Sequence, residues 1–101
     1  MAFPYKLHSQ AIDEYANGYE WYENERYRLG EQFLDVIDRQ IADICENPGY
    51  YSRLRGSYRQ AIVEKFPYVI VYEFFPRRKF IHIAAIFHTS RNPKEKFRKE
   101  E

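Results

Sequence analysis

The sequence holds little cysteine, histidine and glycine, and each shortage excludes a class of site. One cysteine, Cys45, cannot form an internal disulfide, and three separated histidines with one cysteine do not make a metal-ligand set. Four glycines, at positions 18, 30, 49 and 56, form no phosphate-binding pattern. No apolar run is long enough to cross a bilayer. We therefore expect no metal, no cofactor and no membrane partner.

The length and the first residues limit the organisation of the chain. A sequence of 101 residues suits one domain, 1–101, with a single core. The N-terminus lacks a basic segment followed by a long apolar one, so we expect no signal peptide and a cytoplasmic protein. Aromatic residues make up 19% of the chain, including ten tyrosines, and tyrosine is enriched at interfaces. This composition favours a fold that binds a partner.

Charge is distributed unevenly along the chain although the net charge is only +1. Residues 13–46 carry ten acids and three arginines, a balance of −7, whereas residues 47–101 carry twelve cations and five acids, a balance of +7. Such asymmetry predicts two electrostatically different surfaces, of which the basic one suits an acidic partner.

Three short apolar runs predict strands. They span residues 58–63, 66–74 and 80–88, and each is rich in β-branched and aromatic residues. The breaks between them are too brief for a helical crossover, so the runs should form an antiparallel meander.

Two apolar series at helical spacing precede the meander. The first begins after Ser9, which we expect to be the N-cap, and should end near Asn24. The second should begin at Leu29 and end at 47–49, an Asn-Pro-Gly stop. A tight turn at 25–28 would join them as a helical hairpin.

The complete order predicts the fold class. Residues 5–8 alternate weakly and suit a short first strand, and 47–57 should be a loop. The predicted order is β-α-α-β-β-β. We expect an α+β fold in which the helical hairpin packs on one face of a small, mostly antiparallel sheet.

The last two strands of the meander are apolar on both sides. In the second strand, one side should carry Phe66, Tyr68, Ile70, Tyr72 and Phe74, and the other Val69 and Val71. In the third, the two sides should be Phe80, Ala84 and Ile86 against Ile81, Ile83, Ala85 and Phe87. The helices can cover one face only, so the charged C-terminal tail, a partner, or both must shield the other.

A series of local residues runs along nearly the whole chain. It comprises Trp21-Tyr22, Leu29-Gly30-Glu31 with Phe33, Asn47-Pro48, Arg59, and the segments 66–72, 83–88 and 91–93. In this order the residues resemble the RelE/ParE toxin superfamily of bacterial type II toxin–antitoxin systems. The likeness is closer to the ParE-like branch, which includes the plasmid-stabilisation proteins, than to RelE proper.

The resemblance implies a small toxin that is held inactive by an antitoxin encoded beside it. An acidic C-terminal segment of the antitoxin would lie across the toxin, and ParE-type toxins poison DNA gyrase. The residues that we expect to contact the antitoxin or the target are Tyr68, Tyr72, His88, Arg91 and Phe97.

RelE-type members of the superfamily instead cleave messenger RNA on the ribosome. That reaction needs a base, an acid and cationic stabilisers converging on one phosphate. The candidates in this sequence are Arg59, Glu64, His88 and Arg91.

Several features favour a binding toxin over this nuclease. Such relatives usually carry a C-terminal tyrosine after the histidine, whereas Thr89 and Phe97 offer no phenol, and Val69 or a neighbour stands where they carry an arginine. The sequence pI of 7.8 is low for a protein that grips ribosomal RNA. For His88 we favour a strand-end residue hydrogen-bonded to a loop over a catalytic role. A non-toxic interaction module of the same fold stays open, as do the cellular target, the antitoxin and the stoichiometry of the complex.

Overall fold

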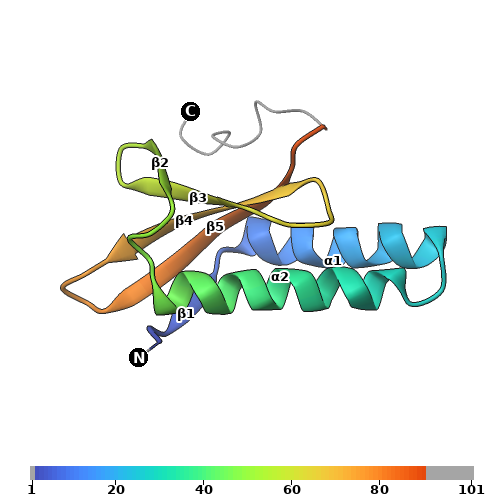
Figure 1. The fold of residues 1–101 in the computed structure, drawn as a ribbon, viewed down its shortest axis with the longest axis horizontal. Coiled ribbons are helices and arrows are strands. Elements are labelled where there is room, and N and C mark those ends of the chain that lie inside the picture. Colours follow the sequence, from blue (N-terminus) through green and yellow to red (C-terminus); the bar gives the residue numbers. More distant parts are fainter. Residues whose placement is uncertain (1, 91–101) are drawn as a thin grey trace.

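A computed structural model of the chain describes residues 2–90, which form two helices on one face of a five-stranded sheet (Figure 1). The elements are β1 (Tyr5–Leu7), α1 (Ser9–Glu25), α2 (Leu29–Glu46), β2 (Ser52–Arg55), β3 (Tyr58–Ile62), β4 (Tyr68–Phe75) and β5 (Phe80–His88). Across the sheet the order is β1-β5-β4-β3-β2, with β1 parallel to β5 and every other pair antiparallel. The predicted α+β class, the helical hairpin and the meander are confirmed.

The turn between the helices is fixed by one carboxylate of α1. The backbone N–H groups of Arg28 and Gly30 donate to the two side-chain oxygens of Glu23, at 3.1 and 3.0 Å. These bonds satisfy donors that the start of α2 would otherwise leave unpaired, and a negative charge there suits the helix dipole. Arg28 adopts a left-handed conformation with φ of 67°. The predicted turn at 25–28 is therefore confirmed.

The N-cap of α1 is His8, so the prediction of Ser9 is wrong by one residue. The Nδ1 atom of His8 accepts a hydrogen bond from the backbone of Gln10 at 3.0 Å. The backbone N–H of His8 also donates to the carbonyl of Ile83 in β5 at 2.8 Å. That bond holds His8 in the extended conformation that a cap requires, and the helix starts directly after it.

The predicted loop at 47–57 contains a strand. Ser52–Arg55 forms β2, which pairs with β3 at the edge of the sheet, and Gly56 supplies a positive φ of 57° in the connecting turn. Only Leu54 in β2 is apolar, and three of its four residues are exposed. An edge strand of this kind lacks the alternation that identifies a strand in a sequence.

The main core lies between the helices and the sheet. Its buried members from α2 include Phe33, Ile37, Ile41 and Ile44, and from the sheet Ile70, Tyr72, Ile81, Ile83 and Ile86. An aromatic cluster of Tyr22, Phe33, Phe66 and Tyr68 extends this core toward the turn between the helices. Burial of each large apolar side chain stabilises the fold by about 1.5–3 kcal/mol.

A β-bulge decides which side of β5 faces the helices. Val71 pairs with Ala85 and Tyr72 with Ile83, so Ala84 is the extra residue. As a result Ile83 and Ile86 both belong to the helix-facing core. The prediction that placed these two residues on opposite sides is wrong, because one extra residue reverses the alternation beyond it. The bulge does not change the alternation of β4 itself. Val69 and Val71 therefore lie together on the side away from the helices, as predicted.

Candidate functional site

The sheet face opposite the helices, here called the outer face, is apolar at its centre. Neither helix lies on it (Figure 1). Its central residues Val69, Val71 and Ala85 are 6, 1 and 2% exposed, and Leu54 and Tyr58 pack against them. The outer face is therefore apolar rather than wet and polar, as the two-sided strands predict. The C-terminal tail that was expected to contribute to shielding it lies outside the described residues.

The end of β3 forms part of the rim of the outer face, because β2 pairs with β3 only as far as Gln60. Ile62 pairs with Val69 and is 74% exposed, a high value for a large apolar side chain. Gln60 pairs with Val71 two residues earlier, and its side-chain oxygen is buried with no hydrogen-bond partner among the described residues. Sequence reasoning named neither residue, although the period-2 spacing of 58, 60 and 62 on one strand was available to it.

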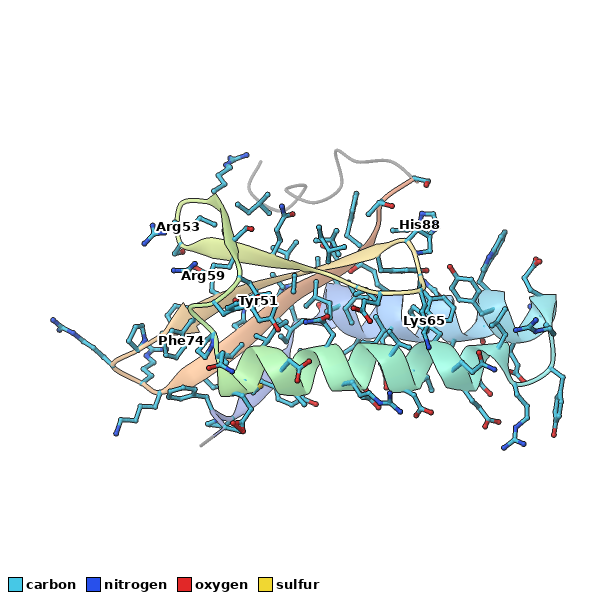
Figure 2. The ribbon with its side chains drawn as sticks, viewed as in Figure 1. Tyr51, Arg53, Arg59, Lys65, Phe74 and His88 are labelled. Carbon is cyan, nitrogen blue, oxygen red and sulfur yellow. The ribbon has the colours of Figure 1, made fainter. Side chains whose placement is uncertain are left out.

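Arg59 holds the segment after α2. It lies on β3 opposite Tyr72, and its Nη1 donates to the backbone carbonyl of Tyr51 at 2.6 Å (Figure 2). Its side chain is half-buried, and the nearby positive charge lowers the pKa of Tyr72 against the larger effect of burial. These contacts give Arg59 a structural role at this end of the sheet.

His88 ends β5 at the other end of the sheet. Its ring meets that of Tyr68 edge to face, with centroids 5.1 Å apart. Its Nδ1 accepts a hydrogen bond from the backbone of Ser90 at 3.1 Å. This is the geometry of a strand-end histidine bonded to the following loop.

The structure does not bring Arg59 and His88 together. Their partners on β4, Tyr72 and Tyr68, are four residues apart, which corresponds to roughly 13 Å along the strand. They also lie on the two strands that flank β4, roughly 10 Å apart across the sheet. Figure 2 shows them well apart along the sheet. Arg91, the fourth nuclease candidate, lies outside the described residues.

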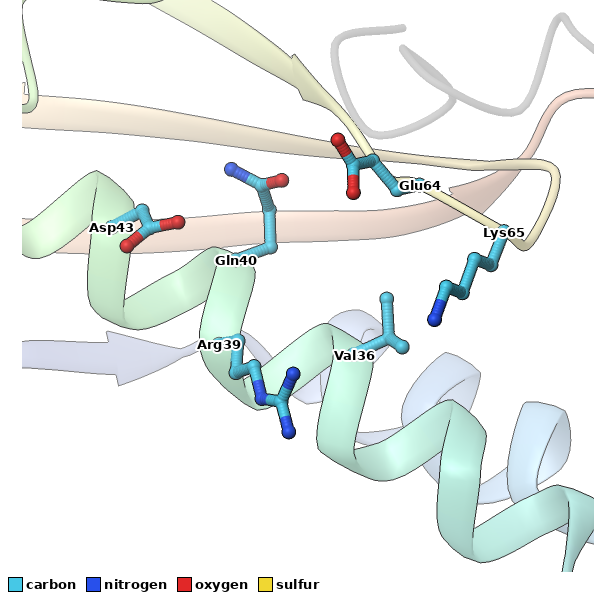
Figure 3. A pocket seen from close by; sticks show the side chains of 6 residues that line it. All are labelled: Val36, Arg39, Gln40, Asp43, Glu64 and Lys65. Atoms are coloured by element: carbon cyan, nitrogen blue, oxygen red, sulfur yellow. The ribbon is translucent and has the colours of Figure 1, made fainter.

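Glu64 lies at a separate pocket between α2 and the turn from β3 to β4. The pocket has a volume of about 200 Å³ and is lined by Val36, Arg39, Gln40, Asp43, Glu64 and Lys65 (Figure 3). Two of the lining residues are cations, Arg39 and Lys65, and two are carboxylates, Asp43 and Glu64. Lys65 adopts a left-handed conformation with φ of 72°. The lining comes from α2 and this turn alone, so Glu64 is placed here without Arg59 or His88.

The two tyrosines expected at a partner surface are core residues. Tyr72 is 0% exposed, and its hydroxyl donates to the carbonyl of Pro48 at 2.6 Å. Burial raises the pKa of Tyr72 to about 12. Tyr68 is 3% exposed within the aromatic cluster. The surface that this chain offers to a partner therefore lies elsewhere, and Phe97 is outside the described residues.

Comparison with known families decides the identity of the chain. The family described as "ParE toxin of type II toxin-antitoxin system, parDE" matches residues 5–93. The chain belongs to the ParE toxin family. Proteins of curated function give no match. Within residues 2–90, neither helix of this ParE-family chain is long and apolar enough to span a membrane.

Solved structures share the fold of the ParE-family chain at low sequence identity. The chromosomal ParDE system of P. aeruginosa matches with a TM-score of 0.75 and 15% identity, over 86% of this chain and 96% of that one. The isolated E. coli RelE toxin matches with a TM-score of 0.68 and 14% identity, over 98% and 97%. The toxin of the E. coli RelBE toxin–antitoxin complex gives 0.66 and 15%, over 85% and 95%. These likenesses establish a RelE/ParE-like fold.

Proposed function

We propose that this ParE-family toxin acts by binding a protein target, DNA gyrase, and is neutralised by a cognate antitoxin. The observation that carries the choice of binding over RNA cleavage is the separation of Arg59 from His88 across β4. Membership of the ParE family supports gyrase as the target.

The chemistry of RNA cleavage explains why this separation supports binding over cleavage. A base, an acid and a cationic stabiliser must all lie within hydrogen-bond reach of one phosphate group and its neighbouring hydroxyl. Arg59 is bonded to the backbone of Tyr51, and Glu64 lines a different pocket. A toxin that acts by binding a protein needs no such convergence of catalytic groups. It needs a surface that is complementary to its partner.

The outer face suits an antitoxin segment. Ile62 offers an exposed apolar anchor, and Arg55 in the neighbouring strand β2, opposite Tyr58, supplies positive charge for an acidic chain. The E. coli RelBE complex pairs a toxin of the same fold with its antitoxin. The antitoxin proposed for this chain is therefore acidic with apolar side chains that cover the rim of β3.

Incubation of the purified toxin with gyrase and plasmid tests the target. We expect lost supercoiling and trapped cleavage complexes. Because no catalytic histidine is involved, His88→Ala should weaken these two effects at most, through a lost contact with the target, and should not abolish them. Unchanged supercoiling and no trapped complex would count against gyrase. The antitoxin, added in excess, should restore supercoiling.

Two induction experiments separate the remaining alternatives. Cuts in cellular messengers that disappear with His88→Ala would establish RNA cleavage and overturn the proposal. Normal growth after induction without antitoxin would leave a non-toxic interaction module. We expect arrested growth with intact messengers.

A further inference from the structure

The turn between β4 and β5 carries a concentrated positive charge. Arg77, Arg78 and Lys79 follow one another, all three are exposed, and the turn contains no acid. Within residues 2–90 none of the three forms an ion pair. The backbone N–H of Arg78 donates to the carbonyl of Phe75 at 3.1 Å, and that of Lys79 to Pro76 at 3.2 Å. The three charges are thus presented by a hydrogen-bonded turn.

A shallow, open apolar cleft lies within the same turn. It has a volume of about 400 Å³ and is lined by Phe75, Pro76, Arg77 and Arg78. The rings of Phe75 and Phe80 are nearly parallel, at 18°, with centroids 6.4 Å apart. The guanidinium of Arg78 lies 5.9 Å from the centroid of the Phe75 ring. The turn therefore combines flat aromatic surface with unneutralised cations.

We propose that this turn binds single-stranded nucleic acid. A base would stack in the cleft against Phe75 and Pro76, and successive phosphates would contact Arg77, Arg78 and Lys79. Stacking on aromatic rings together with cations along the backbone is the general mode of single-strand binding. Planar guanidinium groups suit both phosphate and base faces.

The observations favour a nucleic acid over an acidic peptide. A strand of nucleic acid carries one negative charge on every nucleotide. This regular charge matches three adjacent cations without an intervening acid. Flat bases also stack on an aromatic ring such as that of Phe75, which aliphatic side chains cannot do. The turn directly precedes β5, and His88 is the last residue of that strand. The two are roughly 25 Å apart along the nine residues of β5. The site is thus distinct from the His88 end of the sheet, although Arg59 lies opposite Tyr72, only three residues before Phe75 on β4. It goes beyond gyrase binding without depending on it.

Binding of labelled oligo-dT and oligo-rU to the isolated chain, measured by fluorescence anisotropy at several salt concentrations, tests the proposal. Three phosphate contacts predict a slope of about −2 when the logarithm of the binding constant is plotted against the logarithm of the salt concentration. Arg77→Ala combined with Arg78→Ala should reduce this slope by about 1.4 and the affinity at low salt by about tenfold or more. Comparison of the two oligonucleotides distinguishes DNA from RNA.

A matched control removes the same charge elsewhere. Arg26 and Arg39 are exposed residues of the helical hairpin, so Arg26→Ala combined with Arg39→Ala should leave the affinity and the slope nearly unchanged. Equal losses in the two double variants would overturn the proposal, since they would reflect net charge alone.

Stacking is tested separately. Phe75→Leu keeps an apolar side chain in the cleft but removes the ring, and it should weaken binding about tenfold without changing the salt slope. Thermal unfolding confirms that the variant is folded. No binding of either oligonucleotide, or an acidic peptide that displaces them and loses its own affinity in the Arg77/Arg78 variant, would overturn the nucleic-acid proposal. The assay contains no gyrase, so its failure leaves the proposed target untouched.

Discussion

Glu14 and Ile86 are joined by a hydrogen bond although they are 72 residues apart in the chain. The backbone N–H of Ile86 in β5 donates to a carboxylate oxygen of Glu14 in α1 at 2.7 Å. Strand β1 pairs only with residues 81–83 of β5, so it ends before it reaches Ile86. The carboxylate therefore takes the place of a strand partner and ties the first helix to the sheet.

Replacement of Glu14 by Ala should destabilise the fold. The amide of Ile86 would lose its acceptor in a partly buried setting, at a cost of about 1–3 kcal/mol in the free energy of unfolding. Glu14→Gln keeps an acceptor oxygen and should recover most of this loss. Urea unfolding of the three proteins measures the difference, and equal midpoints for the Ala variant and the parent would contradict it.

Gly30 allows the two helices to approach closely. A Cβ atom there would lie 2.6 Å from the backbone oxygen of Tyr19, and a backbone atom cannot turn aside. Gly30→Ala should therefore destabilise the protein by about 1–3 kcal/mol despite the higher helix propensity of alanine. Gly49→Ala is the matched control, because a Cβ there meets nothing within 4 Å. Thermal unfolding of both variants should show a lower midpoint only for Gly30→Ala.

Tyr72 should make the fold sensitive to high pH. Burial raises its pKa to about 12 from an ordinary value of 10.0, so the folded state holds this proton more tightly than the unfolded state does. The resulting stability is fully present below pH 10 and is lost as the pH rises from about 10 through about 12. Urea unfolding at a series of pH values should show this decline.

Tyr72→Phe isolates the contribution of the phenol. The variant loses the hydrogen bond to Pro48, so at neutral pH it should be less stable by about 0.5–1.5 kcal/mol. Its stability should fall less steeply above pH 10 than that of the parent. Some dependence should persist, because burial and the hydrogen bond to Asp38 also raise the pKa of Tyr15. An identical pH profile for parent and variant would contradict the assignment to Tyr72.

Ile62→Asp should weaken antitoxin binding if the outer face is the docking surface. A charge at an exposed apolar anchor facing an acidic segment should raise the Kd at least about tenfold. The stability of the toxin alone should change by less than about 0.5 kcal/mol, since the side chain is 74% exposed. Ile12→Asp on α1, 50% exposed, is the control on the helical side. Titration calorimetry with the antitoxin should show weaker binding for Ile62→Asp than for Ile12→Asp. Equal affinities of the two variants would exclude the rim of β3 as the docking surface.

The sequence by itself determined most of the elements of this ParE-family fold. The apolar period of α2 and the short runs of β3, β4 and β5 are local patterns, and the brief connections leave an antiparallel meander as the arrangement. The two-sided apolar character of β4 likewise follows from its own residues, since no bulge interrupts that strand's own alternation.

Only the tertiary structure decided where the candidate residues lie. Pairing across three strands separates Arg59 from His88, and no single stretch of sequence encodes that distance. The extra residue at Ala84 appears only in the register of β5 against β4, and the cap at His8 depends on a hydrogen bond to Ile83. Periodicity records which residues prefer burial, whereas a site depends on which strands become neighbours, and that is set by contacts between distant parts of the chain.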